Sequence, residues 1–157
     1  MRRRHLSGPA GAALVLVAGG GVLAGCAGPV ELADPPVDQP TRSICEAVVA
    51  ASPDTVLGSP RRDTTGTLAT AWGNPPITLA CGIPQPEGLT PTSQCLEVDG
   101  VGWWPQDGTT GQLFTTIGRA THVQVGVPHS YGNTSDVLAE LSPVVAEHDP
   151  QVFACAG

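Results

Sequence analysis

Residues 113–127 read LFTTIGRATHVQVGV, with apolar and polar side chains alternating on both sides of a short turn. This alternation predicts two antiparallel strands, 113–117 and 121–127, joined by the turn 118–120. Successive side chains of a strand point to opposite faces, so the valines of the second strand share one face and His122 points to the other. The centre of the chain is therefore expected to form a sheet.

Two more strand pairs are expected before this one. Strands 68–72 and 77–81 flank a turn rich in glycine and proline. Strands 95–98 and 101–104 flank an Asp-Gly pair. That pair forms either a tight hairpin or a bulge, and the sequence does not decide between them.

A helix is expected at each end of the strand region. The S-x-x-E stretch 43–46 is typical of a capping box and predicts a helix start. Residues 133–148 predict a second helix, with Asn133 or Thr134 as its N-cap and a kink or a break at Pro143. The predicted fold class is α+β: a small antiparallel sheet of about four to six strands, with both helices packed on one face.

The amino-terminal segment predicts export and a lipid anchor. Residues 1–5 carry arginines, an apolar run follows, and the run ends in LAGC at 23–26. This ending resembles a bacterial lipobox, which implies cleavage of the signal peptide 1–25 and two acyl chains on Cys26. The expected location is the outer face of the cytoplasmic membrane, held through Cys26. An ordinary cleaved signal peptide is the alternative.

The rest of the chain is acidic and contains no lysine. Loss of residues 1–25 removes three arginines and takes the formal net charge from −7 to −10, which disfavours nucleic acid as a partner. The missing amine excludes Schiff-base chemistry and a P-loop lysine. Residues 27–40, AGPVELADPPVDQP, contain four prolines and predict an extended tether over 26–40. A single globular domain is expected over 41–157.

Four cysteines remain besides the predicted anchor, namely Cys45, Cys81, Cys95 and Cys155. An even number in an exported chain predicts two disulfides, with three possible connectivities. We favour 81–95 with 45–155, because the first closes a short proline-rich loop and the second ties the first element to the last residues. A zinc site is less well supported because no C-x-x-C occurs.

Three segments together resemble a known family. Residues 70–84, 98–103 and 114–119 are similar, in that order, to the actinobacterial family called domain of unknown function 3515. Its members are exported or lipid-anchored envelope proteins without an assigned activity. The resemblance therefore implies a location and a fold but no catalytic residue. Asn74 and Gly102 stand where the family pattern has acidic residues.

Several side chains suggest a surface for an envelope protein or a glycan. Adjacent tryptophans in a strand point to opposite faces, so one of Trp103 and Trp104 is expected in the core. The other either stacks on a partner from the open face or lies under the proline-rich loop. Arg119 either binds an anionic group of a partner, or it has a structural role on loop carbonyls or on an acidic residue of a strand. The candidate surface comprises Trp72, Trp103, Trp104, Arg119 and His122.

The expected function is a non-catalytic binding or accessory module of the envelope, with no cofactor and no metal. The alternative is an extracellular hydrolase of cell-wall material, with His122, Glu97 and Asp99 as the residues to mutate first. Neither G-x-S-x-G nor H-E-x-x-H occurs, and either would have favoured the enzyme.

Overall fold

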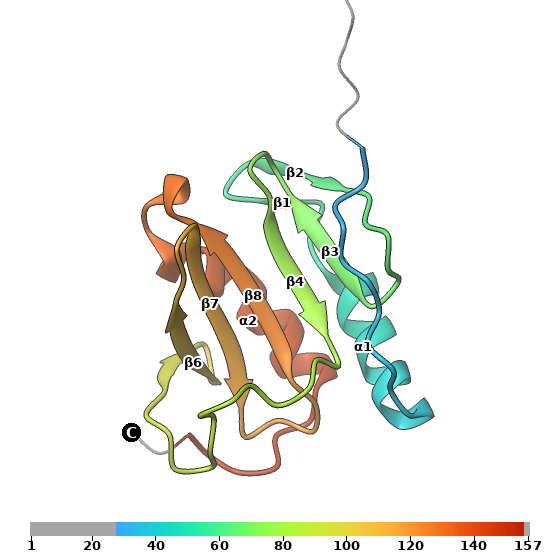
Figure 1. Cartoon of the computed structure of the whole chain (residues 1–157). Helices are drawn as coiled ribbons and strands as arrows, with labels where there is room; N and C mark the ends of the chain where they lie inside the picture. The colour runs from blue at the N-terminus through green and yellow to red at the C-terminus, as the bar shows by residue number, and fades with distance from the viewer. Residues whose placement is uncertain (1–27, 156–157) are drawn as a thin grey trace, which may run out of the picture.

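The computed structural model describes residues 28–155, so the predicted signal peptide and Cys26 lie outside the described residues. Two helices accompany an antiparallel sheet (Figure 1). In chain order the elements are α1 (Gln39–Ala51), β1 (Thr55–Val56), β2 (Ser59–Arg62), β3 (Ala69–Trp72), β4 (Ile77–Cys81), β5 (Leu96–Val98), β6 (Val101–Asp107), β7 (Gly111–Ile117), β8 (Val123–Pro128), the 3₁₀ helix η1 (His129–Tyr131) and α2 (Thr134–His148).

The sheet has eight strands in the order β1-β2-β3-β4-β8-β7-β6-β5. All three predicted strand pairs are confirmed as antiparallel neighbours. The sheet exceeds the expected four to six strands because β1 and β2 add two strands to the six of the predicted pairs. Strands β1 and β2 are two and four residues long and carry no apolar alternation, so their sequence contains no strand signal.

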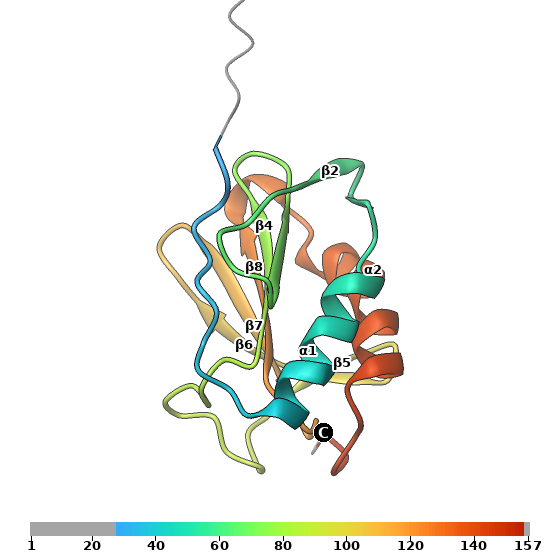
Figure 2. The same ribbon diagram turned by 90° about the vertical axis from the view of Figure 1, so that its right-hand side faces the viewer.

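The hydrophobic core lies on one face of the sheet. In β4, Ile77, Leu79 and Cys81 are fully buried and alternate with partly exposed residues, and the three buried valines of β8 lie on the same face. Both helices lie on this side of the strands in Figure 2. The apolar stripe of α2 completes the core with Val137, Leu138, Leu141 and Val145.

The Asp-Gly pair makes a tight hairpin rather than a bulge. Val98 pairs directly with Val101, which leaves a turn of two residues. Asp99 and Gly100 have φ values of 46° and 75°, the left-handed backbone of a type I′ turn. This turn matches the twist of β5 and β6 and fixes their register.

Helix α1 begins earlier than predicted. Asp38 is its N-cap and accepts a hydrogen bond of 3.0 Å from the backbone N–H of Thr41, with Pro40 in the first turn. The predicted capping box is therefore wrong, since Ser43 lies inside the helix and donates to the carbonyl of Gln39. An aspartate cap followed by proline is the stronger start signal here.

Helix α2 continues through its proline. Asn133 is the N-cap, as one of the two expected alternatives, and accepts from the N–H of Ser135 at 3.2 Å. The predicted break at Pro143 is wrong: the residue lies on the exposed side of one continuous helix. The buried apolar stripe on the opposite side packs this helix on the sheet and offsets the lost backbone hydrogen bond.

The disulfides pair differently from the favoured expectation. The structure joins Cys45 to Cys81 and Cys95 to Cys155, with Cα–Cα distances of 5.3 and 6.2 Å. The reason is the face of the sheet on which each sulfur lies. Cys81 points into the core beneath α1, whereas Cys155 packs against Gly102 on the opposite face. A pairing of Cys81 with Cys95 would have to cross the sheet.

Residues 28–38, which we call the strap, lie along the open face, opposite the helices (Figure 2). The backbone of Val30 exchanges hydrogen bonds of 2.8 and 3.0 Å with Asp63 and Thr65. Farther along, Asp34 Oδ1 accepts from the N–H of Leu68 at 2.8 Å. The strap is therefore fixed to the domain, unlike the extended tether expected for these residues.

Candidate functional site

Two of the predicted surface tryptophans belong to the core. Trp72 and Trp103 are fully buried. The indole N–H of Trp72 donates to the carbonyl of Pro53 at 2.8 Å, and that of Trp103 donates to Ser142 Oγ at 2.9 Å. The expectation that Trp72 and Trp103 contribute to a binding surface is wrong, because neither ring reaches solvent.

Trp104 lies on the open face, as the alternation with Trp103 predicts, and it is partly exposed. A methyl group on Gly88 would lie 3.8 Å from its ring, so the loop after β4 lies beside the indole. This arrangement matches the alternative in which the proline-rich loop covers the second tryptophan.

Arg119 is a structural residue. Its guanidinium donates to the carbonyls of Asp149 and Gly100 at 2.9 and 2.6 Å, so it joins the β5–β6 turn to the end of α2. Arg61 acts in the same way at the end of α1, donating to the carbonyls of Val49 and Ser52. Of the two expected roles for Arg119, the structure shows the one on loop carbonyls.

His122 lines a hollow of about 210 Å³ on the open face, together with Arg119, Leu89 and Phe153. Burial lowers the pKa of its imidazole, which favours the neutral ring. The structure thus brings His122 and Arg119 together but does not place Trp104 among the lining residues.

The residues of the alternative hydrolase are not assembled. Glu97 lies in the edge strand β5 and Asp99 in the turn that follows it. His122 directly precedes β8, which is separated from β5 by β6 and β7. The hollow that His122 lines includes neither Glu97 nor Asp99.

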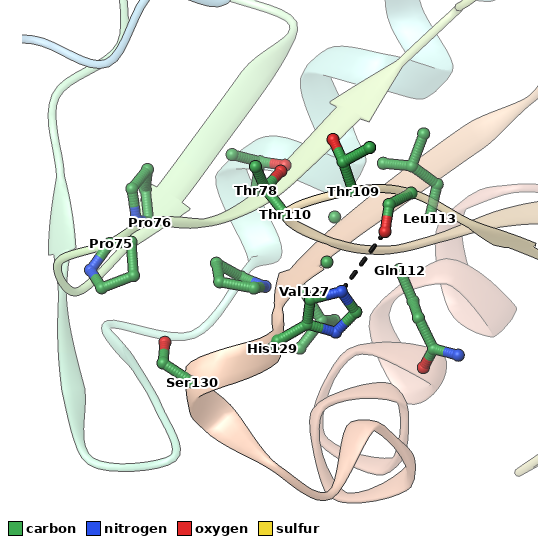
Figure 3. Close-up of a pocket in the computed structure, with 14 residues that line it drawn as sticks. Pro75, Pro76, Thr78, Thr109, Thr110, Gln112, Leu113, Val127, His129 and Ser130 are labelled. Atoms are coloured by element: carbon green, nitrogen blue, oxygen red, sulfur yellow. Dashed lines mark hydrogen bonds between the residues drawn. The ribbon is translucent and has the colours of Figure 1, made fainter.

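A larger cleft of about 810 Å³ lies at one end of the sheet. It is formed by the β3–β4 turn, the β6–β7 turn, and the end of β8 with η1. Figure 3 shows Pro75 and Pro76 on one side of this cleft and Thr109 and Leu113 on the other. Its lining consists of Pro75, Pro76, Thr78, Gly108, Thr109, Thr110, Gly111, Gln112, Leu113, Gly126, Val127, Pro128, His129 and Ser130.

A glycine in the middle strand helps to shape the floor of the cleft. Gly126 pairs with Thr78 on one side and Leu113 on the other. A Cβ at this position would lie 2.6 Å from Thr78 Oγ1 and 3.3 Å from Leu113 Cδ2. A glycine inside an alternating strand is a signal of close approach, and it is the one signal in the sequence that points to this cleft.

The 3₁₀ helix η1 connects the two walls. His129 Nε2 lies 3.3 Å from the carbonyl oxygen of Gly108. The backbone N–H of His129 donates to the carbonyl of Thr110 at 3.1 Å. Tyr131 donates its hydroxyl to the carbonyl of Pro75 at 2.8 Å. Both turns are thereby fixed to η1, and the shape of the cleft is built into the fold.

His129 is the one ionisable side chain among the residues that line the cleft. None of its residues is Asp, Glu, Lys or Arg. Proline rings and Leu113 supply apolar surface, and the hydroxyls of Thr78 and Ser130 supply hydrogen-bonding groups. This combination suits a ligand with an apolar body and an uncharged polar part.

A family of proteins of unknown function matches residues 10–153, which is nearly the whole chain. The chain belongs to the DUF3515 family. No curated protein and no solved structure matches it. The DUF3515 match spans the strap, the sheet and every residue of the cleft.

The described part of this DUF3515 protein shows neither a metal-binding cluster nor a membrane-spanning helix. Among residues 28–155, no group of three His, Cys, Asp or Glu side chains is placed to hold a metal ion. Neither α1 nor α2, the two α-helices of this range, has the length and hydropathy to cross a membrane.

Proposed function

We propose that this DUF3515 protein is a lipid-anchored module on the outer face of the cytoplasmic membrane that binds an uncharged, largely apolar ligand without converting it. The cleft carries this proposal. Its volume of about 810 Å³ falls in the range of roughly 300–1,000 Å³ typical of ligand sites. Its walls are fixed to each other by hydrogen bonds, and no acidic or basic chain other than His129 lines it.

Binding accounts for these features better than hydrolysis does. Hydrolysis needs an acid, a base or a nucleophile held at a reacting atom. The cleft offers one imidazole, whose Nε2 lies beside the Gly108 carbonyl, and no carboxylate. A surface for a glycan or a protein around the tryptophans is also less well supported, because Trp72 and Trp103 are buried and Arg119 is bound to carbonyls.

The membrane location rests on the sequence. The LAGC ending at Cys26 is the predicted site of lipidation, and the described domain offers no spanning helix as another anchor. Intact-mass analysis of the membrane fraction tests this part. We expect a mature chain that starts at Cys26 with acyl chains attached, and a Cys26→Ser variant that is released from the membrane.

The binding part is tested with an uncharged fluorescent probe, N-phenyl-1-naphthylamine, added to the full-length protein in detergent. Leu113 lies in the cleft and is 39% exposed, so Leu113→Asp places a charge there at little cost to the core. We expect probe affinity to fall by about tenfold or more. Leu96→Asp is the matched control, since Leu96 is 42% exposed and lies outside the cleft. Equal affinities for both variants would contradict the proposal.

A further inference from the structure

We infer that the strap holds the cleft end of the domain against the bilayer, so that the cleft receives a hydrocarbon chain of a membrane lipid without net charge. This inference rests on the proposed anchor at Cys26 and names the ligand class of the proposed cleft. It follows from where Gly28, the first described residue, is bound, and from what lines the cleft.

The strap is fixed to the domain as far back as Gly28. Arg62 donates to the carbonyl of Gly28 at 2.9 Å and to the carbonyl of Gly73 at 3.1 Å. One planar guanidinium therefore binds both carbonyls, which places them within about 8 Å of each other. Gly73 begins the β3–β4 turn, and Pro75 and Pro76 of that turn form one wall of the cleft.

The proposed anchor, Cys26, comes just before the strap in the sequence. Only Ala27 separates Gly28 from Cys26 in the sequence, and two residues of chain reach at most about 8 Å. The polar layer on each side of a bilayer is roughly 5–8 Å thick. A domain anchored through so short a connection rests on the membrane instead of standing away from it.

The end that faces the membrane is the end with the cleft. Strand β8 ends there at Pro128 and β7 begins there at Gly111, whereas the turns at Asp99 and Gly118 lie at the other end of the same antiparallel strands. Figure 1 shows the strap entering at the end of the sheet where β3 finishes and β4 starts. The cleft and the anchor therefore share one end of the molecule.

The apolar, uncharged lining of the cleft favours some membrane components over others. Proline rings and the half-exposed side chain of Leu113 offer hydrocarbon surface, which favours an acyl chain over a sugar or a peptide. No lysine or arginine lines the cleft to hold an anionic headgroup. The mature chain would carry a formal charge of −10, which repels such lipids. A lipid with an uncharged or zwitterionic headgroup fits both conditions.

Photocrosslinking in vesicles tests the inference. Full-length lipidated protein, verified by intact mass, carries benzoylphenylalanine at Thr109 in the cleft or, as a control, at Asp99 at the far end. The vesicles contain phosphatidylcholine with deuterated acyl chains. We expect deuterated lipid adducts at Thr109 to exceed those at Asp99 by about tenfold, and Leu113→Asp to remove them. Equal yields, or adducts formed only with the acyl chains of Cys26 itself, would overturn the inference.

A second variant tests the strap. Arg62→Lys keeps the charge but cannot bridge two carbonyls with a planar fork, so the Thr109 adduct should fall severalfold. Arg61→Lys is the matched control, because Arg61 binds carbonyls at the end of α1, away from the strap. An unchanged adduct in Arg62→Lys would show that the strap does not orient the cleft. If Cys26 carries no lipid, the proposed anchor fails; if it is lipidated and Thr109 forms no lipid adduct, only this inference fails.

Discussion

Trp103 of β6 donates its indole N–H to Oγ of Ser142 in α2 at 2.9 Å, and both side chains are fully buried. Ser142→Ala would leave this N–H without an acceptor in the core. Loss of a buried partner costs about 1–3 kcal/mol, so we expect the free energy of unfolding to fall by that amount. Denaturant titration of the oxidised protein measures it.

Ser135→Ala is the control for this variant, since Ser135 lies on the exposed side of the same helix. Its substitution should change the free energy of unfolding by less than about 0.5 kcal/mol. Equal free energies of unfolding for the two variants would contradict a stabilising role of the hydrogen bond between Trp103 and Ser142.

Asp149 makes stability depend on pH. Its side chain is buried, its Oδ1 accepts from the N–H of Thr121 at 3.2 Å, and within residues 28–155 its Oδ2 has no hydrogen-bond partner. Burial raises the pKa of this carboxyl from 3.8 to about 6. Folding therefore favours the protonated form, and stability is lost as the pH rises from below 4 through about 6.

Asp149→Asn removes this titration. The stability difference between wild type and variant should shift by about 2–3 kcal/mol in favour of the variant between about pH 4 and pH 8. Unfolding curves at several pH values measure this shift. A change in stability that the amide causes equally at every pH does not affect it. Asp54→Asn, at an exposed carboxylate, should follow the wild-type profile. Parallel profiles for Asp149→Asn and wild type would contradict the assignment.

The disulfide pairing is directly testable. Peptide mapping without reduction should recover 45–81 and 95–155, and pairs 81–95 or 45–155 would contradict the structure. The closed loops span 36 and 60 residues, for which chain entropy gives about 4 kcal/mol each. Removal of either pair by double alanine substitution should therefore lower the free energy of unfolding substantially. Mass spectrometry and denaturant titration provide the two measurements.

The sequence predicts the fold where the signal is local. Alternation identifies the strands around residues 68–81 and 113–127, and the apolar stripe identifies α2. The sequence narrows the N-cap of α2 to Asn133 or Thr134, because a cap depends only on its own neighbours, and the structure has Asn133. These elements depend on periodicity and on short hydrogen bonds, both of which a single sequence displays.

The disulfides, the strap and the cleft depend on contacts between distant segments. Cys81 pairs with Cys45 because both side chains lie in the core, between α1 and β4. The position of α1 over β4 cannot be read from the sequence pattern. The cleft needs the β3–β4 turn beside η1, which lies more than fifty residues later in the chain. Prolines in residues 28–40 predict an extended backbone, but not that Asp34 binds Leu68. The sequence pattern therefore located the elements but not the site.

Gly102 tests how closely the second disulfide packs on the sheet. A Cβ at this position would lie 2.8 Å from Ile117 Cγ2 and 2.9 Å from Cys155 Sγ. Gly102→Ala should therefore lower the free energy of unfolding by about 1–3 kcal/mol, the usual cost of overpacking. Gly28→Ala, where a Cβ meets nothing within 4 Å, should leave it unchanged. In a Cys95→Ala, Cys155→Ala background the tail can move away, so the cost of Gly102→Ala should shrink. An undiminished cost would mean that Ile117 alone excludes a side chain here.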